Sequence, residues 1–268
     1  MHFQNQVVLI TGASSGIGRR LAIDLATKGA TVIGCGRSAE RLQQTEEEMR
    51  RANRSCAMMA CDLGERREVE EMVGRVVADF GRIDILINNA GIGMRKPFVE
   101  SSVETVEAIM RTNYLGMVYC THAVLPSMIA RGKGHIVNIS SVAGKIGTLN
   151  TAAYCASKFA MNGFSESLYH ELKPLGIHVS IICPGPVRTG FNKSFADTPP
   201  RSPRSLVVSP EFVSQAVIYA IEQRRFEVVI PRSLALMCWF KSMMPGFFRA
   251  VLRRIFAARL PSPKKREI

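Results

Sequence analysis

Two kinds of apolar pattern alternate along the first 230 residues of the chain. Short continuous apolar runs rich in Val and Ile are separated by longer segments with apolar residues every three or four positions. Continuous runs are typical of parallel strands buried on both faces, and the longer period is typical of amphipathic helices. We therefore expect strands at 7–11, 31–35, 56–60, 84–88, 134–140, 177–183 and 226–230, and helices at 17–28, 38–53, 65–80, 103–131, 151–173 and 211–223.

This alternation predicts the fold class. Strands that alternate with helices form βαβ units, which build a parallel sheet with helices on both faces. No internal repeat is visible, and the proline-rich stretch 192–210 lies between a predicted strand and a predicted helix, which indicates a surface loop. We expect one α/β domain over 1–232, with a doubly wound parallel sheet of about seven strands.

Residues 233–268 form a different kind of segment. After the apolar run 234–240, residues Phe248, Val251, Leu252 and Ile255 follow the i, i+3, i+4, i+7 spacing of an amphipathic helix, and arginines flank them. Such a basic helix can lie in a membrane interface or bind a partner. The alternative is packing over the domain's own substrate site or against a second subunit. We expect packing for 234–244 and membrane or partner contact for 247–260.

The charge balance changes how this extension is interpreted. The 268 residues carry 35 Lys+Arg and 22 Asp+Glu, a net charge of +13, which suggests a polyanionic partner. However, residues 1–223 hold 24 Lys+Arg and 20 Asp+Glu, whereas 224–268 hold 11 and 2. Most of the excess therefore belongs to the extension. Because no nucleic-acid-binding motif accompanies it, we expect no nucleic-acid partner.

The cysteines and histidines carry no metal pattern. Seven cysteines show no C-x-x-C pair and five histidines show no ligand spacing, so we expect free thiols in a reducing compartment and no metal site. The N-terminus lacks the pattern of a secretory signal, and the longest apolar run, 234–240, is too short to span a bilayer. We expect a cytoplasmic protein that meets a membrane, if at all, at its periphery.

A glycine-rich loop joins the first predicted strand to the first predicted helix. It reads Thr-Gly-Ala-Ser-Ser-Gly-Ile-Gly over 11–18, with glycines at 12, 16 and 18. Glycines in such a turn let the backbone approach a pyrophosphate, and the amides of the following helix N-terminus point at it. The alternative is an ordinary tight turn between a strand and a helix.

This loop resembles the cofactor loop of the short-chain dehydrogenase/reductase family. Further signatures of that family follow in the correct order, namely Asn88-Asn89-Ala90-Gly91, Asn113 in Asn-Tyr-Leu-Gly, Ser141, Tyr154-x-x-x-Lys158 and Pro184-Gly185. The resemblance covers roughly residues 5–230. It implies a Rossmann-type sheet and a nicotinamide-dependent oxidoreductase.

The residues after the second predicted strand favour NADP(H). No carboxylate stands there to bind the 2′-hydroxyl of NAD, and Arg37 suits a 2′-phosphate by charge and geometry. The alternative is a solvated Arg37. Ser38 and Ser14 are possible second donors. Some NADP-dependent relatives carry a further basic residue where Ser15 stands, and Arg19 is a candidate to compensate.

The resemblance implies the remaining cofactor contacts. Asp62 would bind the adenine amino group beside Leu63, although a helix cap is the alternative for Asp62. Val187 and Thr189 would contact the nicotinamide carboxamide. The full predicted set is Gly12, Ser14, Ser15, Gly16, Ile17, Gly18, Arg37, Ser38, Asp62, Leu63, Asn89, Ala90, Gly91, Tyr154, Lys158, Pro184, Gly185, Val187 and Thr189.

The predicted catalytic residues are Asn113, Ser141, Tyr154 and Lys158. Tyr154 and Lys158 are four apart in a predicted helix and so face one side, where the ammonium would lower the pKa of the phenol. Ser140 and Ser141 point in opposite directions along a strand, and the family spacing favours Ser141 for binding a carbonyl oxygen. By resemblance, Asn113 holds a water that connects Lys158 to solvent.

The implied reaction interconverts a ketone and a secondary alcohol by hydride transfer, with Tyr154 as general acid and base. The segments 113–119 and 158–160 are similar to those of reductases of long-chain keto-lipids and steroids, so we expect an apolar substrate. Relatives pair through helices corresponding to 103–131 and 151–173, which implies a homodimer or homotetramer. The alternative is a non-catalytic NADP(H)-binding sensor or a membrane-associated scaffold. Candidate pocket walls are Met94, Phe98, Phe191, Phe195 and Leu206.

Overall fold

The sheet has seven strands, and all adjacent pairs are parallel. The structure is a computed structural model that describes residues 3–52, 54–191 and 206–257. The strand order is β3-β2-β1-β4-β5-β6-β7, so the direction of winding reverses between β1 and β4. The predicted fold class is thus confirmed. The strands are β1 (Val7–Thr11), β2 (Thr31–Gly36), β3 (Cys56–Ala60), β4 (Ile85–Asn88), β5 (Gly134–Ile139), β6 (Ile177–Pro184) and β7 (Glu227–Ile230).

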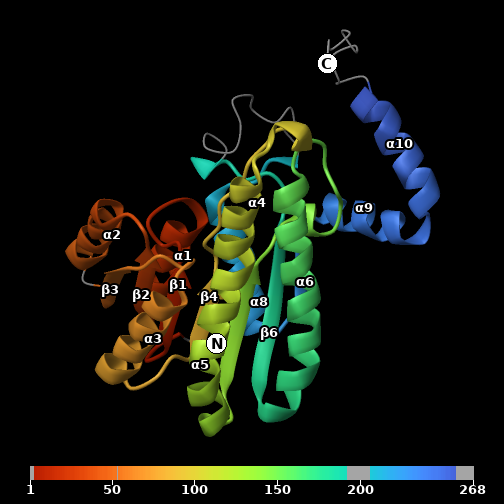
Figure 1. The fold of residues 1–268 in the computed structure, drawn as a ribbon. Helices are drawn as coiled ribbons and strands as arrows, with labels where there is room; N and C mark the ends of the chain where they lie inside the picture. Colours follow the sequence, from red (N-terminus) through yellow and green to blue (C-terminus); the bar gives the residue numbers. More distant parts are fainter. Residues whose placement is uncertain (1–2, 53, 192–205, 258–268) are drawn as a thin grey trace.

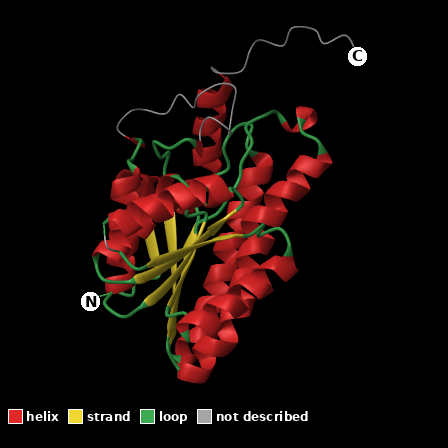
Figure 2. Ribbon diagram, turned by 90° about the vertical axis from the view of Figure 1, so that its left-hand side faces the viewer, coloured by secondary structure: helices red, strands yellow, loops and turns green. Residues whose placement is uncertain are grey.

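Helices cover both faces of this sheet. One apolar core joins the sheet to α1, α2 and α8, and a second joins its other face to α3, α5 and α6. Figure 1 shows α4, α5 and α6 along one face, and Figure 2 shows the strands enclosed between helical layers. These helices are α1 (Gly16–Thr27), α2 (Ala39–Arg51), α3 (Arg66–Phe80), α4 (Val103–Met110), α5 (Gly116–Arg131), α6 (Ala152–Leu172) and α8 (Pro210–Glu222).

The predicted helix 103–131 is interrupted. A π-helical turn at Arg111–Leu115 separates α4 from α5. A π turn inserts an extra residue into the helical repeat and is frequent at functional sites, but apolar periodicity does not reveal it. Three short 3₁₀ helices, at Phe98–Glu100, Val142–Gly144 and Lys173–Leu175, also lie outside the prediction.

The C-terminal extension is helical, as predicted. It consists of α9 (Arg232–Met243) and α10 (Pro245–Ala257), which lie at the edge of the molecule beyond α6 in Figure 1. Leu234 and Phe248 are buried with Val142 and Ile146 in a small third core. Residues 258–260 of the predicted amphipathic helix lie outside the described residues. Within the described part of the chain, no helix combines the length and apolarity needed to cross a membrane.

Candidate active site

A cavity of about 1370 Å³ opens at the carboxyl ends of the strands. The loops that follow β1, β2, β3, β4, β5 and β6 contribute to its wall, together with residues of α6, α9 and α10. The reversal between β1 and β4 places this cavity at the switch point of the sheet, where doubly wound folds bind their ligands.

The glycine-rich loop is shaped by contacts that exclude side chains. Gly12 and Gly16 have φ of +70° and +55°, which disfavours other residues. A Cβ at Gly18 would lie 2.2 Å from the main-chain oxygen of Gly12 and 2.5 Å from Asn89 Nδ2. Gly18 does not line the cavity, and its lack of a side chain lets α1 pack closely against the loop.

The N-terminus of α1 fits the anionic group of a dinucleotide. The first amides of a helix have no intrahelical acceptor, and the side chain of the N-cap residue Ser15 does not cap them. The first turn of α1 contains no acidic residue, and Ser14, Ser15, Gly16 and Ile17 line the cavity. Donors at the positive end of a helix dipole suit a pyrophosphate.

The adenosine end of the predicted site has two cationic side chains. Arg37 follows β2, is exposed and lines the cavity beside Ser38. Ser38 caps α2 by accepting a hydrogen bond from the Arg41 amide at 3.4 Å. Arg41 also lines the cavity, which the sequence analysis missed, although its position four residues after Arg37 was a usable signal. Arg19 does not line the cavity and pairs with Glu48 instead.

Asp62 shapes the loop after β3 and is not a helix cap. Its Oδ1 accepts from the Gly64 amide at 2.9 Å, whereas the N-cap of α3 is Glu65. Asp62 and Leu63 both line the cavity. The Asp62 carboxylate therefore keeps lone pairs on the cavity side for a donor such as an amino group.

Thr11 fixes the loop after β4. Its Oγ1 accepts from the amides of Asn89 at 2.9 Å and Ala90 at 3.0 Å. Asn89 Nδ2 returns a hydrogen bond to the main-chain oxygen of Thr11 at 2.9 Å. Thr11 was not among the predicted site residues. These hydrogen bonds hold the loop after β4 against the start of the glycine-rich loop. Asn89, Ala90 and Gly91 of the loop after β4 line the cavity.

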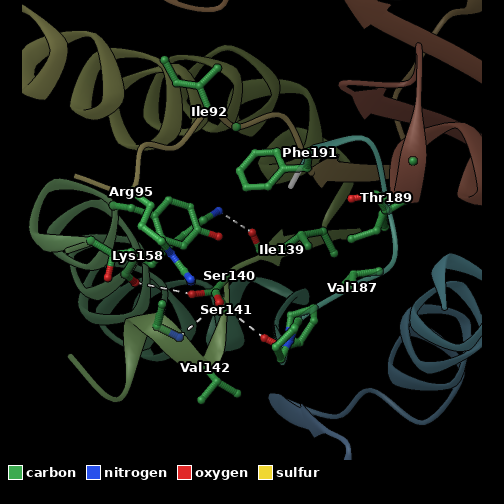
Figure 3. A pocket seen from close by; sticks show the side chains of 18 of the residues that line it. Ile92, Arg95, Ile139, Ser140, Ser141, Val142, Lys158, Val187, Thr189 and Phe191 are labelled. Carbon is green, nitrogen blue, oxygen red and sulfur yellow. Dashed lines mark hydrogen bonds between the residues drawn. The ribbon is translucent and has the colours of Figure 1, made fainter. Parts of the chain in front are cut away.

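Of the two adjacent serines, Ser141 faces the tyrosine. Ser141 Oγ is hydrogen-bonded to Tyr154, and it also accepts from the Ala143 amide at 3.1 Å. Ser140 Oγ is buried and donates to the main-chain oxygen of Lys158 at 3.4 Å. The close-up in Figure 3 shows both serines at the end of the strand that carries Ile139.

The pKa of Tyr154 moves opposite to the expected direction. Burial raises the pKa of the phenol to about 12, while the hydrogen bond with Ser141 acts in the other direction. Lys158 is not among the groups that lower this pKa, and desolvation of the phenolate is the largest effect. Tyr154 is therefore a protonated group at neutral pH in this state of the protein.

Lys158 is buried and held in place. Its side chain is 3 % exposed, and its Nζ donates to the main-chain oxygen of Ile139 at 2.8 Å. The same Nζ lies 5.9 Å from the centroid of the Tyr154 ring. Burial lowers the pKa of Lys158 to about 8.

Asn113 lies in the π-helical turn, behind the cavity wall rather than in it. Its Oδ1 accepts from the Ile92 amide at 2.7 Å, and its Nδ2 donates to the Ile92 oxygen at 2.8 Å and to Ser157 Oγ at 3.0 Å. A Cβ at Gly91 would lie 3.2 Å from Asn113 Oδ1 and 3.9 Å from Lys158 Nζ. Asn113 and Lys158 thus approach the same point beside Gly91.

The segment after β6 completes the opposite wall. Pro184, Gly185, Val187 and Thr189 all line the cavity, and a Cβ at Gly16 would lie 3.3 Å from Thr189 Cγ2. Thr189 is therefore adjacent to the glycine-rich loop. Phe191 places its ring 6.1 Å from that of Tyr154, centroid to centroid.

Most of the predicted site residues, but not all of them, line the cavity. All predicted cofactor and catalytic residues line the cavity except Gly18 and Asn113. Leu206 lines it as well, whereas Met94 and Phe98 do not, and Phe98 is 65 % exposed. Phe195 lies outside the described residues.

Packing was expected for 234–244 and is found for α9, but α10 packs on the domain as well, where membrane or partner contact was expected. Residues of α9 and α10 line the cavity, so the extension packs over the domain's own site along both helices. These residues are Leu234, Met237, Leu252, Ile255 and Phe256. No group of three or more potential metal ligands occurs among the described residues.

These features make up a candidate nucleotide-binding site at the switch point of a doubly wound sheet, with a serine, a tyrosine and a lysine beside it. The family model described as short chain dehydrogenase matches residues 6–200. The chain belongs to this family.

Curated relatives agree with this assignment. The zebrafish dehydrogenase/reductase SDR family member 7B is 41 % identical over 197 residues, which cover 71 % of this chain and 64 % of that protein. The mouse epidermal retinol dehydrogenase 2 is 36 % identical over 245 residues, which cover 90 % of this chain and 78 % of that protein. This chain thus spans less than two thirds of the zebrafish relative.

Solved structures of the family superpose on the fold. A short-chain dehydrogenase/reductase from Burkholderia phymatum in complex with NAD has a TM-score of 0.84 at 25 % identity, covering 92 % of this chain and 96 % of its own. A metagenomic short-chain oxidoreductase in complex with NADP has a TM-score of 0.74 at 31 % identity, covering 86 % and 98 %. A nicotinamide dinucleotide is therefore the cofactor class, in either form.

Proposed function

We propose that this protein is an NADP(H)-dependent oxidoreductase that interconverts a lipophilic ketone and a secondary alcohol. The observation that carries the proposal is the grouping of Ser141, Tyr154 and Lys158 in one cavity with the glycine-rich loop. The similarity to a retinol dehydrogenase supports an apolar substrate.

The protein's own residues would supply binding and the proton. A bound nicotinamide supplies the hydride that converts the carbonyl carbon to that of an alcohol. Ser141 would donate to the carbonyl oxygen and stabilise the charge that develops there. Tyr154, whose pKa lies well above neutral pH and which is therefore protonated, would give its proton to that oxygen.

Lys158 and Asn113 would return a proton to Tyr154. The charged Nζ of Lys158 is held near the phenol by the Ile139 oxygen. A water beside Gly91 would have Asn113 Oδ1 and Lys158 Nζ as neighbours, since the missing side chain of Gly91 leaves room between them. Such a water would connect the buried lysine to solvent.

The preference for NADP(H) rests on Arg37 and Arg41. Both line the cavity after β2, where no carboxylate precedes α2 to bind a 2′-hydroxyl. Two guanidinium groups suit a phosphate because each offers several donors and a full charge. Location in the cytoplasm and pairing through α5 and α6 stay predictions.

An NADPH-oxidation screen over ketones of graded chain length tests the proposed activity. We expect the Tyr154→Phe variant to lose about 10²- to 10⁴-fold in rate on the best ketone, while NADPH binding, followed by fluorescence, is retained. Normal turnover by this variant would contradict the mechanism. Tight NADPH binding by the wild type without turnover of any ketone or alcohol would favour the non-catalytic sensor instead.

A further inference from the structure

An apolar surface covers the outer side of α9 and α10. Of the sixteen large apolar side chains that are exposed in the described residues, six belong to these two helices and a seventh, Met244, connects them. Leu236, Trp239 and Met243 follow one another at helical spacing on α9 and are 67 %, 60 % and 63 % exposed. We define the α9–α10 surface as Leu236, Trp239, Met243, Met244, Phe247 and Val251.

The inner side of the same helices is already occupied. Leu234 and Phe248 are buried in the third core, and Met237, Leu252 and Phe256 line the cavity. The two helices therefore carry apolar side chains on both their inner and outer sides. Packing against the domain buries only the inner side. Exposed apolar patches of this kind mark sites of contact with another apolar phase or partner.

The charges around this surface are all of one sign. Between residues 232 and 257 the sequence has five cations and no acid. Arg232, Arg249, Arg253 and Arg254 are exposed, and within the described residues none of them forms an ion pair. Arg254 lies three residues after Val251 and seven after Phe247, and therefore on the same side of α10 as these two side chains. Arg253 precedes it at the edge of that side.

We propose that the α9–α10 surface docks onto an anionic lipid bilayer. The arginines would contact the anionic headgroups, and the exposed Trp239 and Phe247 would enter the apolar acyl region beneath them. A second copy of this chain is disfavoured, because pairing this surface with itself would bring cations against cations. The proposal needs neither the cofactor nor the reaction, so it stands or falls separately from the proposed function.

Docking in this way would place the bilayer beside the cavity. The inner side of the two helices lines the cavity with Met237, Leu252 and Phe256. Only the thickness of these helices would therefore separate the cavity from the bilayer. This consequence, unlike docking itself, rests on the proposed function: an apolar substrate dissolved in the bilayer would then have a short route to the site.

Trp239 is the only tryptophan of the chain, so its fluorescence reports on this surface alone. We would mix the full chain with vesicles of phosphatidylcholine, with or without phosphatidylglycerol, and measure flotation and emission. We expect association with the anionic vesicles, a blue shift of the Trp239 emission and quenching by brominated lipid. Association should weaken as salt increases.

Paired variants separate insertion from charge attraction. We expect Leu236→Ser with Phe247→Ser, and separately Arg253→Glu with Arg254→Glu, to weaken binding by at least about tenfold. The matched control is Phe212→Ser with Tyr219→Ser on α8, whose side chains are 48 % and 51 % exposed. None of these residues lines the cavity, so turnover of a water-soluble ketone should not change.

Three outcomes would overturn the proposal. One is a Trp239 emission that does not change with any vesicle, as expected if an acidic protein is the partner. A second is a dimer in sedimentation that buries Trp239 and is lost in the Phe247 variant. A third is vesicle binding that the control variant weakens as much as the Leu236 and Phe247 variant does.

Discussion

Ser157 connects Asn113 to the backbone of the candidate catalytic tyrosine. Its Oγ accepts from Asn113 Nδ2 at 3.0 Å and donates to the main-chain oxygen of Tyr154 at 2.8 Å. This buried hydroxyl therefore ties the π-helical turn to the first turns of α6, which carry Tyr154 and Lys158.

We expect Ser157→Ala to lower kcat about 10- to 100-fold while changing the KM for cofactor little. Loss of the hydroxyl leaves the Asn113 amide without this partner, and small shifts of positioned groups cost rate. Unfolding free energy should fall by about 1–3 kcal/mol. Steady-state kinetics and urea unfolding measure the two effects.

Ser165→Ala is the matched control. Ser165 is also buried on α6, accepts from Asn138 Nδ2 at 2.7 Å and donates to the Met161 oxygen at 2.7 Å, but it bonds neither Asn113 nor the backbone of Tyr154. It should lose comparable stability and keep its kcat. Equal losses of kcat in both variants would mean that Ser157 acts only through stability.

Cofactor preference should depend on the arginines after β2. We expect Arg37→Asp to weaken NADPH binding by about 10- to 100-fold and to leave NADH binding largely intact, because a charged hydrogen bond contributes about 1.5–3 kcal/mol. Arg41→Gln should show a smaller loss of the same sign. Titration of each variant with both cofactors measures this.

Arg19→Gln provides the control for charge alone. Arg19 is exposed in the first turns of α1 but pairs with Glu48 and does not line the cavity. Its loss should affect the two cofactors alike. A wild-type protein that prefers NADH would refute the assignment of Arg37.

Gly18→Ala should disrupt the glycine-rich loop. The added Cβ would lie 2.2 Å from the Gly12 oxygen, a backbone atom that cannot move without shifting the loop. We expect loss of cofactor binding and of stability, measured by titration and thermal unfolding. By contrast, Gly163→Ala on α6 meets nothing within 4 Å and should stabilise the helix by about 0.5–1 kcal/mol. Equal behaviour of the two variants would contradict the steric argument.

Sequence patterns predicted the regular part of this fold, the alternating strands and helices. Apolar runs located every strand to within a residue or so, because burial of a parallel sheet requires continuous apolar character. The family motifs predicted that Ser141, Tyr154 and Lys158 lie together, and all three line one cavity. They could be predicted because the carboxyl ends of parallel strands meet at one edge of the sheet. The π turn at Arg111–Leu115 was not predictable, because one added backbone residue leaves the apolar periodicity nearly unchanged.

Packing of 234–244 was expected, but the residues of the extension that line the cavity could not be named from the sequence. Met237 and Leu252 line the cavity only because α9 folds back over Gly185, where Leu234 Cδ1 stands 2.5 Å from the position a Cβ would take. The pKa of Tyr154 was predicted with the wrong direction, since the spacing to Lys158 indicates a charge but not the degree of burial.

His135 should make the stability of the fold sensitive to acid. This buried histidine on β5 bonds through Nε2 to Ser180 Oγ at 2.8 Å, and Ser180 donates to the Arg225 oxygen, so Nε2 carries a proton and donates. Burial, with His178 and Arg224 nearby, lowers the pKa of His135 from 6.5 to about 3. Above pH 6.5 both folded and unfolded states hold a neutral ring, so this residue adds no pH dependence there.

Below pH 6.5 the ring of His135 binds a proton in the unfolded state but stays neutral in the folded state. The folded state therefore loses about 1.4 kcal/mol per pH unit until the pH approaches the folded pKa of His135. We expect urea unfolding of the wild type to lose about 2 kcal/mol more than His135→Gln between pH 7 and pH 5. Glutamine retains an N–H for Ser180 but has no proton to gain. His170→Gln, at an exposed site on α6, should follow the wild type, and a His135→Gln profile parallel to the wild type would show that the ring is not held neutral.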